Sequence, residues 1–540
     1  MKTRLIALLL AICMLMAATA LVACGETPAE TSGTTASSPS ATSETSATAG
    51  SSTASSQSSS QVTTESTVAS SSETDPTGPV TPPTELLNGR EKHPDYQDVN
   101  FGDQTFTFLT MNGDWGDAYC QTYEIYAELT GNDSLLQEAV VDRNNVLESL
   151  YHCKIAEVQV PYPHTTVGDD ISIGGGKYDF VMPLWWNLWY HTTFVDFAKL
   201  DVDLSHSWWD QGYIDCFSTK VDGVTHLSTI SGKFNLESYD MMLLMSVNMS
   251  LYDQLRATGT LDVDIFDAVR NGTWDMDKFL RVIECGSRNI NGNDVLSIND
   301  GDIMGTVDTG DYLFFRGAFF GMGARSIVKN DLGQPVAVDA TNASLDHYTD
   351  IVGKMIDVSQ NPNFEVASNS ETFQAMIDSK VLIRANFFKT LHSSSLSDTR
   401  ICVVPFPKFD AAQDRYYCIT SDRAYGLRVS RGTLKDYGDI SDFLEVFGFH
   451  SEMLLYPEYV KYVSTQILYG GGELSEEMFD FCLRSRSFDP GIFHNTGAHT
   501  TAIQMAMSGK NNISRSITAT APTINEAMKK WQDDIMAQYK

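Results

Sequence analysis

Cysteine is scarce in this chain, and basic residues are far fewer than acidic ones. None of the 9 cysteines among the 540 residues forms a Cys-x-x-Cys pair. Setting aside Cys13 and Cys24 leaves seven, an odd and scattered number, so we expect neither a disulfide framework nor a zinc site, while a single isolated bridge stays open. Lysine and arginine total 37 against 69 aspartates and glutamates, a net charge of −32, and no basic tract is interleaved with aromatics. This composition argues against nucleic acid as a partner.

The motifs of common hydrolases and nucleotide-binding enzymes are also missing. The sequence has no His-Glu-x-x-His, Gly-x-Ser-x-Gly or Gly-x-x-x-x-Gly-Lys-[Ser/Thr] motif. Its 11 histidines are dispersed, and His191, His206 and His226 lack the spacing of metal ligands. The Asn- and Asp-rich stretch 289–302 misses the pattern of a calcium loop, so we interpret it as a surface loop. We therefore predict no catalytic residue, no metal ion and no cofactor, and a protein that is not an enzyme.

Residues 1–24 have the features of a bacterial lipoprotein signal peptide. Lys2 and Arg4 precede an apolar stretch, residues 5–20, that is too short to span a bilayer comfortably. Leu21-Val22-Ala23-Cys24 fits a lipobox, whose cysteine is acylated, by palmitate among other chains, and becomes the new N-terminus. The alternative is an ordinary secretory signal with an incidental cysteine. We predict lipidation at Cys24 and a location on the extracellular face of the cell membrane of a Gram-positive bacterium.

Residues 25–95 contain almost no large apolar side chains, because serine, threonine, alanine, glycine, glutamate and proline make up most of this segment. Such a segment does not bury enough apolar surface to offset the entropy cost of ordering, so we expect a disordered linker. Between an acylated cysteine and a folded body, this linker is predicted to serve as a stalk that lifts the body away from the lipid headgroups.

The rest of the chain, residues 96–540, alternates between strand and helix patterns. A polar–apolar alternation predicts a strand over 104–110, and a spacing of three and four predicts a helix over 134–152. Further strands are predicted over 153–160, 179–182 and 401–404. Helices are predicted over 275–286, 344–358, 370–380, 438–455 and 524–538, the first of them capped by Asp275 or Asp277. Strand–helix–strand alternation indicates an α/β fold with largely parallel sheets.

Seven stretches in collinear order then resemble a known family. They are "FLTMNGDWG" (108–116), "YDFVMPLWWN" (178–187), "MLLMSVNMSLYDQL" (242–255), "NGTWDMDKFLRVIE" (271–284), a glycine-containing segment with a small β-ribbon (312–339), "ETFQAMIDSKVLIRANFF" (371–388) and "VVPFPKFDAAQDRYYCI" (403–419). Their order resembles the extracellular solute-binding proteins of carbohydrate ABC transporters (family 1 type). The likeness implies the type II periplasmic-binding-protein fold, in which a hinge joins two α/β lobes across a cleft. It places the first lobe at 96–240 and 366–425, and the second at 241–365 and 426–540.

The resemblance also implies a function and its partners. A lipid-anchored extracellular receptor of this kind binds a carbohydrate, here an oligosaccharide, and delivers it to the permease subunits of an ABC transporter. We expect a monomer attached to the membrane by its lipid. Two alternatives stay open: a surface glycan-binding sensor, which would use the same cleft, and a glycoside hydrolase, which needs two carboxylates across the cleft.

Sugars present apolar C–H faces and a ring of hydroxyls, so their sites combine flat aromatics with planar polar groups. After strands we expect such groups at Asp114, Trp115, Trp185, Trp186, Asn187, Trp189 and Asn386. Trp185 and Trp186 are adjacent, so only one of them is expected to face the ligand. Arg316 stands where sugar-binding relatives often place a tryptophan, and it would suit an acidic sugar. Each residue also has a structural alternative in core packing or ion pairing, and for Trp208 and Trp209 we favour packing.

Overall fold

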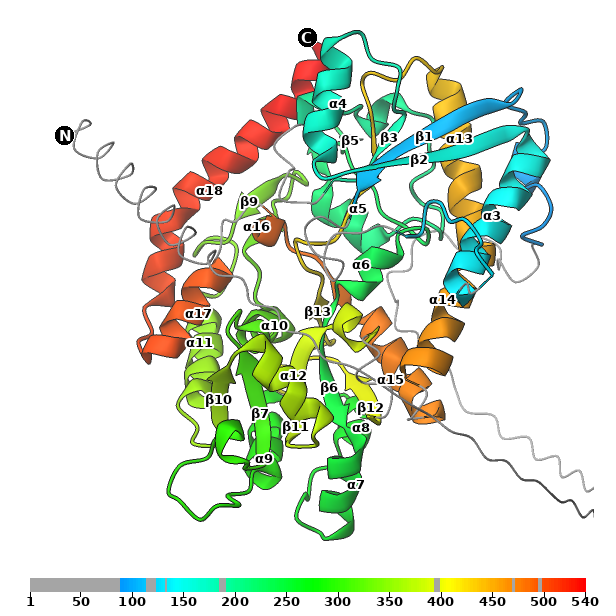
Figure 1. The fold of residues 1–540 in the computed structure, drawn as a ribbon. Coiled ribbons are helices and arrows are strands. Elements are labelled where there is room, and N and C mark those ends of the chain that lie inside the picture. The colour runs from blue at the N-terminus through cyan, green and yellow to red at the C-terminus, as the bar shows by residue number, and fades with distance from the viewer. Residues whose placement is uncertain are drawn as a thin grey trace, which may run out of the picture. The chain divides into compact units, whose positions relative to one another are not determined.

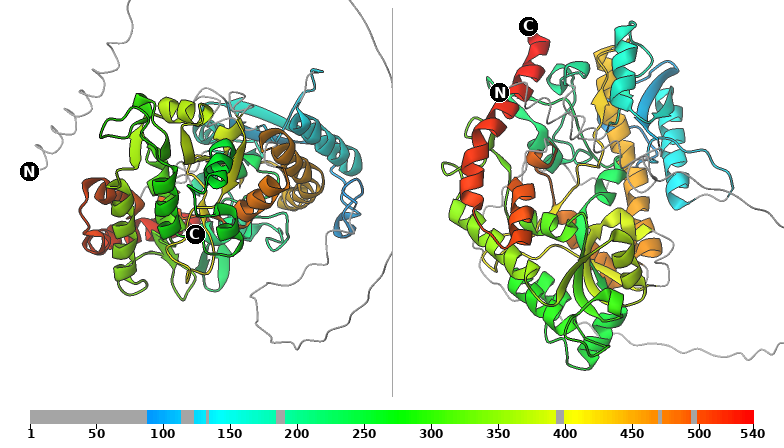
Figure 2. Two further views of the ribbon diagram at one scale, coloured as in Figure 1. Left: turned by 90° about the horizontal axis from the view of Figure 1, so that it is seen from below. Right: turned by 60° about the vertical axis from the view of Figure 1, so that its left-hand side comes forward.

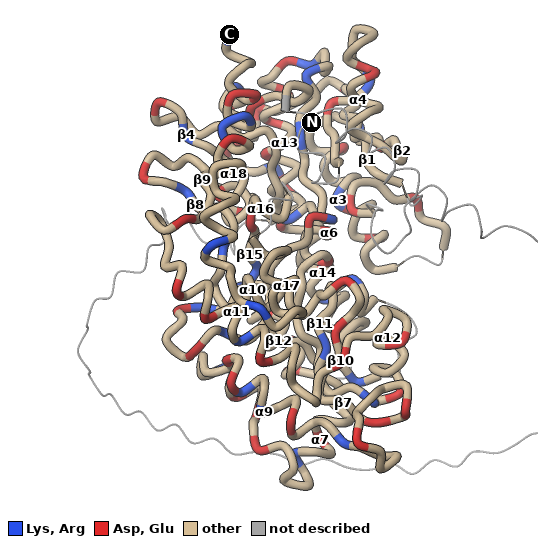
Figure 3. The backbone as a smooth tube through the Cα atoms, turned by 90° about the vertical axis from the view of Figure 1, so that its left-hand side faces the viewer, with Lys and Arg blue, Asp and Glu red and all other residues tan. Residues whose placement is uncertain are grey.

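The computed structural model describes residues 88–112, 123–131, 134–183, 191–392, 399–468, 472–493 and 498–540. Cys24 and the predicted linker up to residue 87 lie outside the described residues. Among the described helices, none is long and apolar enough to cross a membrane. Within the described ranges, aspartates and glutamates are spread over both lobes, with lysines and arginines among them (Figure 3). The described cysteines are free thiols: Cys153, Cys216, Cys285, Cys402, Cys418 and Cys482.

Strands and helices alternate in the first lobe as the sequence predicts (Figure 1). Along the chain come β1 (Gln104–Met111), α3 (Leu135–Tyr151), β2 (Cys153–Val160), α4 (Pro163–Ser172) and β3 (Phe180–Val181). β2 and β3 flank β1 and run parallel to it, and β14 (Arg428–Val429) pairs antiparallel with β3. α3 begins at a capping box, in which the Ser134 hydroxyl accepts from the Gln137 amide at 3.2 Å while Gln137 Oε1 accepts from the Ser134 amide at 2.9 Å.

The two faces of the first sheet are covered by different helices. On one face, Phe443 of α13 (Tyr437–His450) stacks on Phe106 with ring centroids 3.9 Å apart, and residues of α3 join the same cluster. On the other face, Val167 of α4 packs with Leu109 and Val181. α5 (Gln211–Phe217) follows, with Ile214 in the cluster of the first lobe and Tyr213 and Phe217 in that of the second, and then the hairpin of β4 (Thr219–Val221) and β5 (Val224–His226). Both faces are therefore buried, as expected for a parallel sheet.

The second lobe has a five-stranded sheet in the order β10-β7-β11-β6-β12. Its strands are β6 (Leu243–Asn248), β7 (Met304–Thr309), β10 (Phe364–Ala367), β11 (Val381–Phe387) and β12 (Ile401–Val404). Its helices are α7 (Met249–Ala257), α8 (Ile265–Arg270), α9 (Met276–Gly286), α10 (Leu313–Gly321), α11 (Leu345–Ser359) and α12 (Asn369–Ile377). Asp275 caps α9, and β8 (Ile327–Lys329) pairs with β9 (Pro335–Ala337), so the predicted cap and ribbon are both confirmed.

Each sheet contains one antiparallel strand, and that strand arrives from the other lobe. β6 enters the second sheet directly after the crossover that carries α6 (Leu236–Asp240), and it pairs antiparallel with β11 and β12. β14 enters the first sheet after the crossover that carries β13 (Cys418–Ile419). The two lobes thus exchange a strand each, and the chain passes between them more than once (Figures 1 and 2).

The C-terminal part of the chain runs along both lobes. α13 continues through a π-helical turn (Ser451–Leu455) into α14 (Tyr456–Tyr462), followed by α15 (Glu473–Arg484), β15 (Arg486–Ser487), α16 (Pro490–Phe493), α17 (Ala498–Ser508) and α18 (Ile513–Met536). α18 packs against β8 and β9, and beyond its end Gln538 Nε2 donates to the carbonyl of Phe194 at 2.9 Å in the first lobe. Figure 1 shows α18, in red, running from α17 up to the C-terminus at the top of the first lobe.

The predicted lobe boundaries need correction. Residues 366–425 were expected in the first lobe, but β11 and β12 pair with β6, with Ile383 opposite Val247, and so belong to the second sheet. The chain returns to the first lobe only at β14, near residue 428. The C-terminal range 426–540, expected in the second lobe, is divided, because β14 and α13 pack in the first.

Gly317 allows α10 to lie directly against Phe406. A Cβ built on Gly317 would overlap the Phe406 ring, which belongs to the same buried cluster. We expect Gly317→Ala to lower the free energy of unfolding by about 1–2 kcal/mol, because overpacking costs roughly 1–3 kcal/mol and the better helix propensity of alanine returns up to about 1. Chemical denaturation measures this change. Gly353→Ala, at a helical glycine with open space around it, should not destabilise the protein.

Candidate functional site

The carboxyl ends of the parallel strands point toward the crossovers in both lobes. In the second sheet Leu243, the first residue of β6, lies opposite Phe387, the last residue of β11. Because β6 has just arrived from the first lobe, the carboxyl ends of β7, β10 and β11 lie at the edge of the second sheet nearest the first. In the first sheet β14 likewise begins beside Val181, at the carboxyl end of β3. Ligands of α/β folds bind at such edges.

A buried network of charged side chains joins the segments at this edge. Lys389, in the 3₁₀ helix Phe388–His392 after β11, donates to the two carboxylate oxygens of Glu237 in α6 at 2.6 and 2.8 Å. Asp240, one turn further along α6, accepts from the hydroxyls of Tyr123 at 2.5 Å and Tyr459 at 2.8 Å. Both carboxylates are fully buried. The network therefore ties the first lobe, the crossover, the second sheet and α14 together.

The electrostatics of this network favour a protonated Lys389 and disfavour ionisation of the carboxyl groups of Glu237 and Glu124. Burial raises the pKa of Glu237, although Lys389 opposes the shift. Burial also raises the pKa of Glu124 to about 7, against the bond that its carboxylate accepts from the Tyr123 amide at 2.9 Å. Burial alone would lower the pKa of Lys389, but attraction to Glu237 and Asp240 outweighs it and the net shift is upward. We therefore assign Lys389 as an ammonium ion beside three acids.

A cavity of about 510 Å³ lies among residues of the crossovers and of α14 and α15. The two tyrosines of its lining are already covered by the protein's own cations: Lys233 Nζ lies 4.0 Å from the centre of the Tyr456 ring, and the Arg486 guanidinium lies 3.9 Å from that of Tyr239. Arg486 also forms an ion pair with Asp210. Because both tyrosine faces are covered, this cavity offers less stacking surface to a sugar than its composition indicates.

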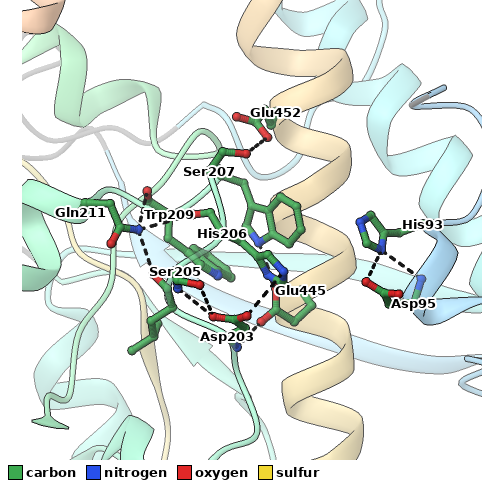
Figure 4. Close-up of polar contacts among 12 residues, drawn as sticks. His93, Asp95, Asp203, Ser205, His206, Ser207, Trp209, Gln211, Glu445 and Glu452 are labelled. Atoms are coloured by element: carbon green, nitrogen blue, oxygen red, sulfur yellow. Dashed lines mark hydrogen bonds and ion pairs between the residues drawn. The ribbon is translucent and has the colours of Figure 1, made fainter. Parts of the chain in front are cut away.

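A second polar cluster fastens the loop 203–211 to α13 (Figure 4). Glu445 of α13 accepts from Trp208 Nε1 at 3.0 Å and contacts His206 Nδ1 at 3.0 Å. Glu452 accepts from the Ser207 hydroxyl at 2.7 Å. Trp208 and Trp209 are both buried in the core of the first lobe, which confirms the packing role predicted for them. This cluster holds the loop in place.

Most of the predicted ligand-binding residues lie outside the described residues: Asp114, Trp115, Trp185, Trp186, Asn187 and Trp189. The two described ones belong to the second lobe. Arg316 lies half-buried in the first turn of α10, just beyond the carboxyl end of β7. Asn386 is buried in β11, where it accepts from the Ser246 hydroxyl at 2.9 Å and donates to the Phe387 carbonyl at 3.1 Å. Its amide is thus engaged within the sheet, and its role in ligand binding stays a prediction.

Sequence reasoning missed the network around Lys389. Glu237 and Asp240 lie in a short helix within a run of buried residues, and no motif marks them. The one available signal is the position of Lys389 directly after a strand that is buried throughout. The loop 289–302 is explained without a ligand, because the carboxylate of Asp302 accepts from the amides of Ile290 at 2.7 Å and Ser297 at 3.2 Å. In the described part of the chain, no group of side chains has the arrangement of a metal site.

No protein-family model and no curated protein sequence matches this chain. Among solved structures it is similar to the GacH receptor of Streptomyces glaucescens, solved unliganded and with acarbose (13% identity, TM-score 0.45, 79% of this chain and 99% of that one). It is also similar to a cyclo/maltodextrin-binding protein complexed with maltotetraose (11%, 0.49, 78% and 97%) and to the sugar-binding protein MalE from Xanthomonas citri (11%, 0.49, 79% and 98%). The strand order and the exchange of β6 and β14 between the sheets give this chain the two-lobed α/β fold of type II periplasmic binding proteins, as its sequence predicts.

Proposed function

We propose that this protein is an extracellular receptor that captures a carbohydrate, an oligosaccharide, between its lobes and delivers it to an ABC permease. The observation that carries the proposal is the strand exchange, which turns the carboxyl ends of the strands in each lobe toward the crossovers that join the lobes. Two lobes connected in this way can close on a ligand by bending at the crossovers. Acylated Cys24 and the segment 25–95 would hold the receptor at the membrane surface.

The proposed mechanism is binding and closure without a change in covalent bonds. Trp115 follows β1, and the tryptophans at 185, 186 and 189 follow β3. There Trp115, Trp189 and one of the adjacent pair Trp185 and Trp186 would stack on sugar rings from the first lobe. Polar groups after β7 and β11 would meet the hydroxyls from the second. The Lys389–Glu237 pair would hold the crossover helix α6 against the segment after β11 while the lobes close, because its two hydrogen bonds join these segments.

A panel of neutral and acidic oligosaccharides tests the proposal by thermal shift on the chain without its signal peptide. We expect at least one saccharide to raise the melting temperature, because a ligand bound only by the folded state stabilises it. Trp115→Ala and the double variant Trp185→Ala/Trp186→Ala should abolish the rise without lowering the melting temperature of the free protein by a comparable amount. Full binding in both variants would remove these tryptophans from the site. If the purified protein instead released shorter sugars at enzymatic rates, the receptor proposal would be wrong and the protein would be a glycoside hydrolase.

A further inference from the structure

The side chain of Arg428 is buried without a counter-ion. It is 1% exposed, and none of its three guanidinium nitrogens has a hydrogen-bond acceptor among the described residues. No carboxylate in the described part of the chain lies within ion-pair distance of it. The guanidinium carbon lies 4.7 Å from the centre of the Phe194 ring, and the imidazole of His164 is within electrostatic range of it. A charge buried in this way is costly to the fold unless a partner arrives.

Two other arginines with buried side chains, Arg143 and Arg486, have partners supplied by the fold itself. Arg143, fully buried, donates from all three nitrogens: to the side chains of Asn144 and Ser451, and to the carbonyls of Glu124 and Ile125, at 2.8–3.1 Å. Arg486 is paired with Asp210. Arg428 differs from these two, because none of its three nitrogens has a hydrogen-bond partner within the described part of the chain.

Arg428 lies where the proposed ligand would be bound. It is the first residue of β14, reached directly from the crossover, and it pairs with Val181 at the carboxyl end of β3. The phenol of Tyr213 lies within electrostatic range of its guanidinium and shares a hydrogen bond of 2.8 Å with Thr229. Tyr213 of α5 packs in the hydrophobic cluster that contains Leu243 of β6, a strand of the second sheet. The guanidinium is therefore on the side of the first lobe that meets the second.

A second arginine with a buried, unsatisfied nitrogen lies in the second lobe. Arg316 follows the carboxyl end of β7, and its Nε is buried without an acceptor among the described residues. The nearby imidazole of His499 supplies no negative charge to it, and burial together with Arg316 lowers the pKa of His499 to about 3. The first turn of α10 adds the positive end of a helix dipole.

We propose that Arg428 binds a carboxylate of the captured saccharide, with Arg316 binding a second one from the opposite lobe, so that the ligand is a uronic-acid-containing oligosaccharide. This inference rests on the proposed function and narrows its ligand class. The planar guanidinium matches a carboxylate through two parallel N–H···O bonds, and a buried setting strengthens them.

Calorimetric titration of the mature chain with a matched pair of ligands tests the inference. The acidic ligand is a tetrameric oligogalacturonate, and the neutral one is the same tetramer with its carboxylates methyl-esterified. We expect the wild type to bind the acidic form at least tenfold more tightly. Arg428→Met should abolish this preference and raise the melting temperature of the free protein, because an unpaired buried charge is removed. Arg316→Gln should weaken binding at least fivefold, and Arg281→Met, at an exposed arginine paired with Asp262, should change nothing.

Four outcomes would overturn the inference. If the methyl ester binds as tightly as the acidic form or more tightly, or if only neutral oligosaccharides bind, the proposal of an acidic ligand is wrong while the proposal of a carbohydrate receptor stands. Undiminished acidic binding by Arg428→Met shows that Arg428 is structural. Stabilisation by sodium acetate equal to that by the oligogalacturonate shows an adventitious anion only. Absence of binding by every saccharide overturns the proposed function together with the inference. If Arg428→Met does not fold, the relative affinity of the wild type for the acidic and the esterified tetramer still tests the inference.

Discussion

Lys389→Met is expected to lower the free energy of unfolding by about 3–5 kcal/mol near pH 8, since removing one partner of a buried ion pair leaves the other uncompensated. The lysine donates to both oxygens of Glu237 and attracts Asp240 and Glu124, and all three acids are buried. Without the ammonium ion, these acids must keep buried negative charges or take up protons. Chemical denaturation of wild type and variant at matched pH measures the loss.

The dependence on pH separates this loss from a simple packing defect. Burial already raises the pKa of Glu237 and Glu124, and removal of the lysine raises both further. A folded-state pKa above the ordinary value means that stability falls as pH rises through it, so the loss should shrink toward pH 5. The double variant Lys389→Met/Glu237→Gln should recover part of it. Lys461→Met, at an exposed lysine paired with Glu458, serves as control. A loss that is constant from pH 5 to 8 would contradict the electrostatic origin.

Local patterns predicted the first lobe closely. The strand predicted over 153–160 is β2 to the residue, and the helix predicted over 134–152 is α3 with its caps. These elements are marked by short-range chemistry: alternation in the strand, a spacing of three and four in the helix, and serine with glutamine at the cap. The strand order is not visible in such patterns, but β1–α3–β2 alternation constrains it strongly.

The prediction of the lobe boundaries failed because they depend on strand pairing between distant segments. The stretch 371–388 has the buried character of a strand in either sheet, and only its partner β6, far earlier in the chain, assigns it to the second. The same holds for the site. Lys389 and Glu237 meet through the fold, and Arg428 is unusual only for what its surroundings lack. No sequence window contains both sides of such a contact.

The start of α18 was predicted too late for a different reason. Its first part is rich in serine, threonine and alanine and contains Pro522, which argues against a helix. Yet Ile513, Ile517 and Ala521 continue the spacing of four that buries Ile524 further on. The start of this apolar stripe, Ile513 and Ile517, packs in the large cluster of the second lobe, and the later part packs against β8 and β9, so tertiary packing outweighs weak local propensity.

Glu124→Gln is expected to stabilise the protein at and above pH 8 by about 3 kcal/mol. The carboxyl is fully buried, and its pKa of about 7 lies about 2.5 units above the ordinary 4.5, at roughly 1.4 kcal/mol per unit. The folded chain therefore holds a proton that the unfolded chain releases. The favourable contribution of this group is complete below pH 4.5 and is lost as pH rises through 7. A glutamine of similar shape carries no charge and removes that loss.

Denaturation profiles from pH 5 to 9 test this, with Glu128→Gln as the matched control, because Glu128 is exposed in the same segment. The wild type should lose stability between pH 5 and 8, and Glu124→Gln should flatten that slope while the control keeps it. The amide can still accept the bond from the Tyr123 amide, so the local backbone is preserved. A variant less stable than wild type at pH 9 would mean that Glu124 is held as a carboxylate, with Lys389 as its effective counter-ion. In that case the three acids would share one cation, and Lys389→Met should cost more than Glu124→Gln at every pH.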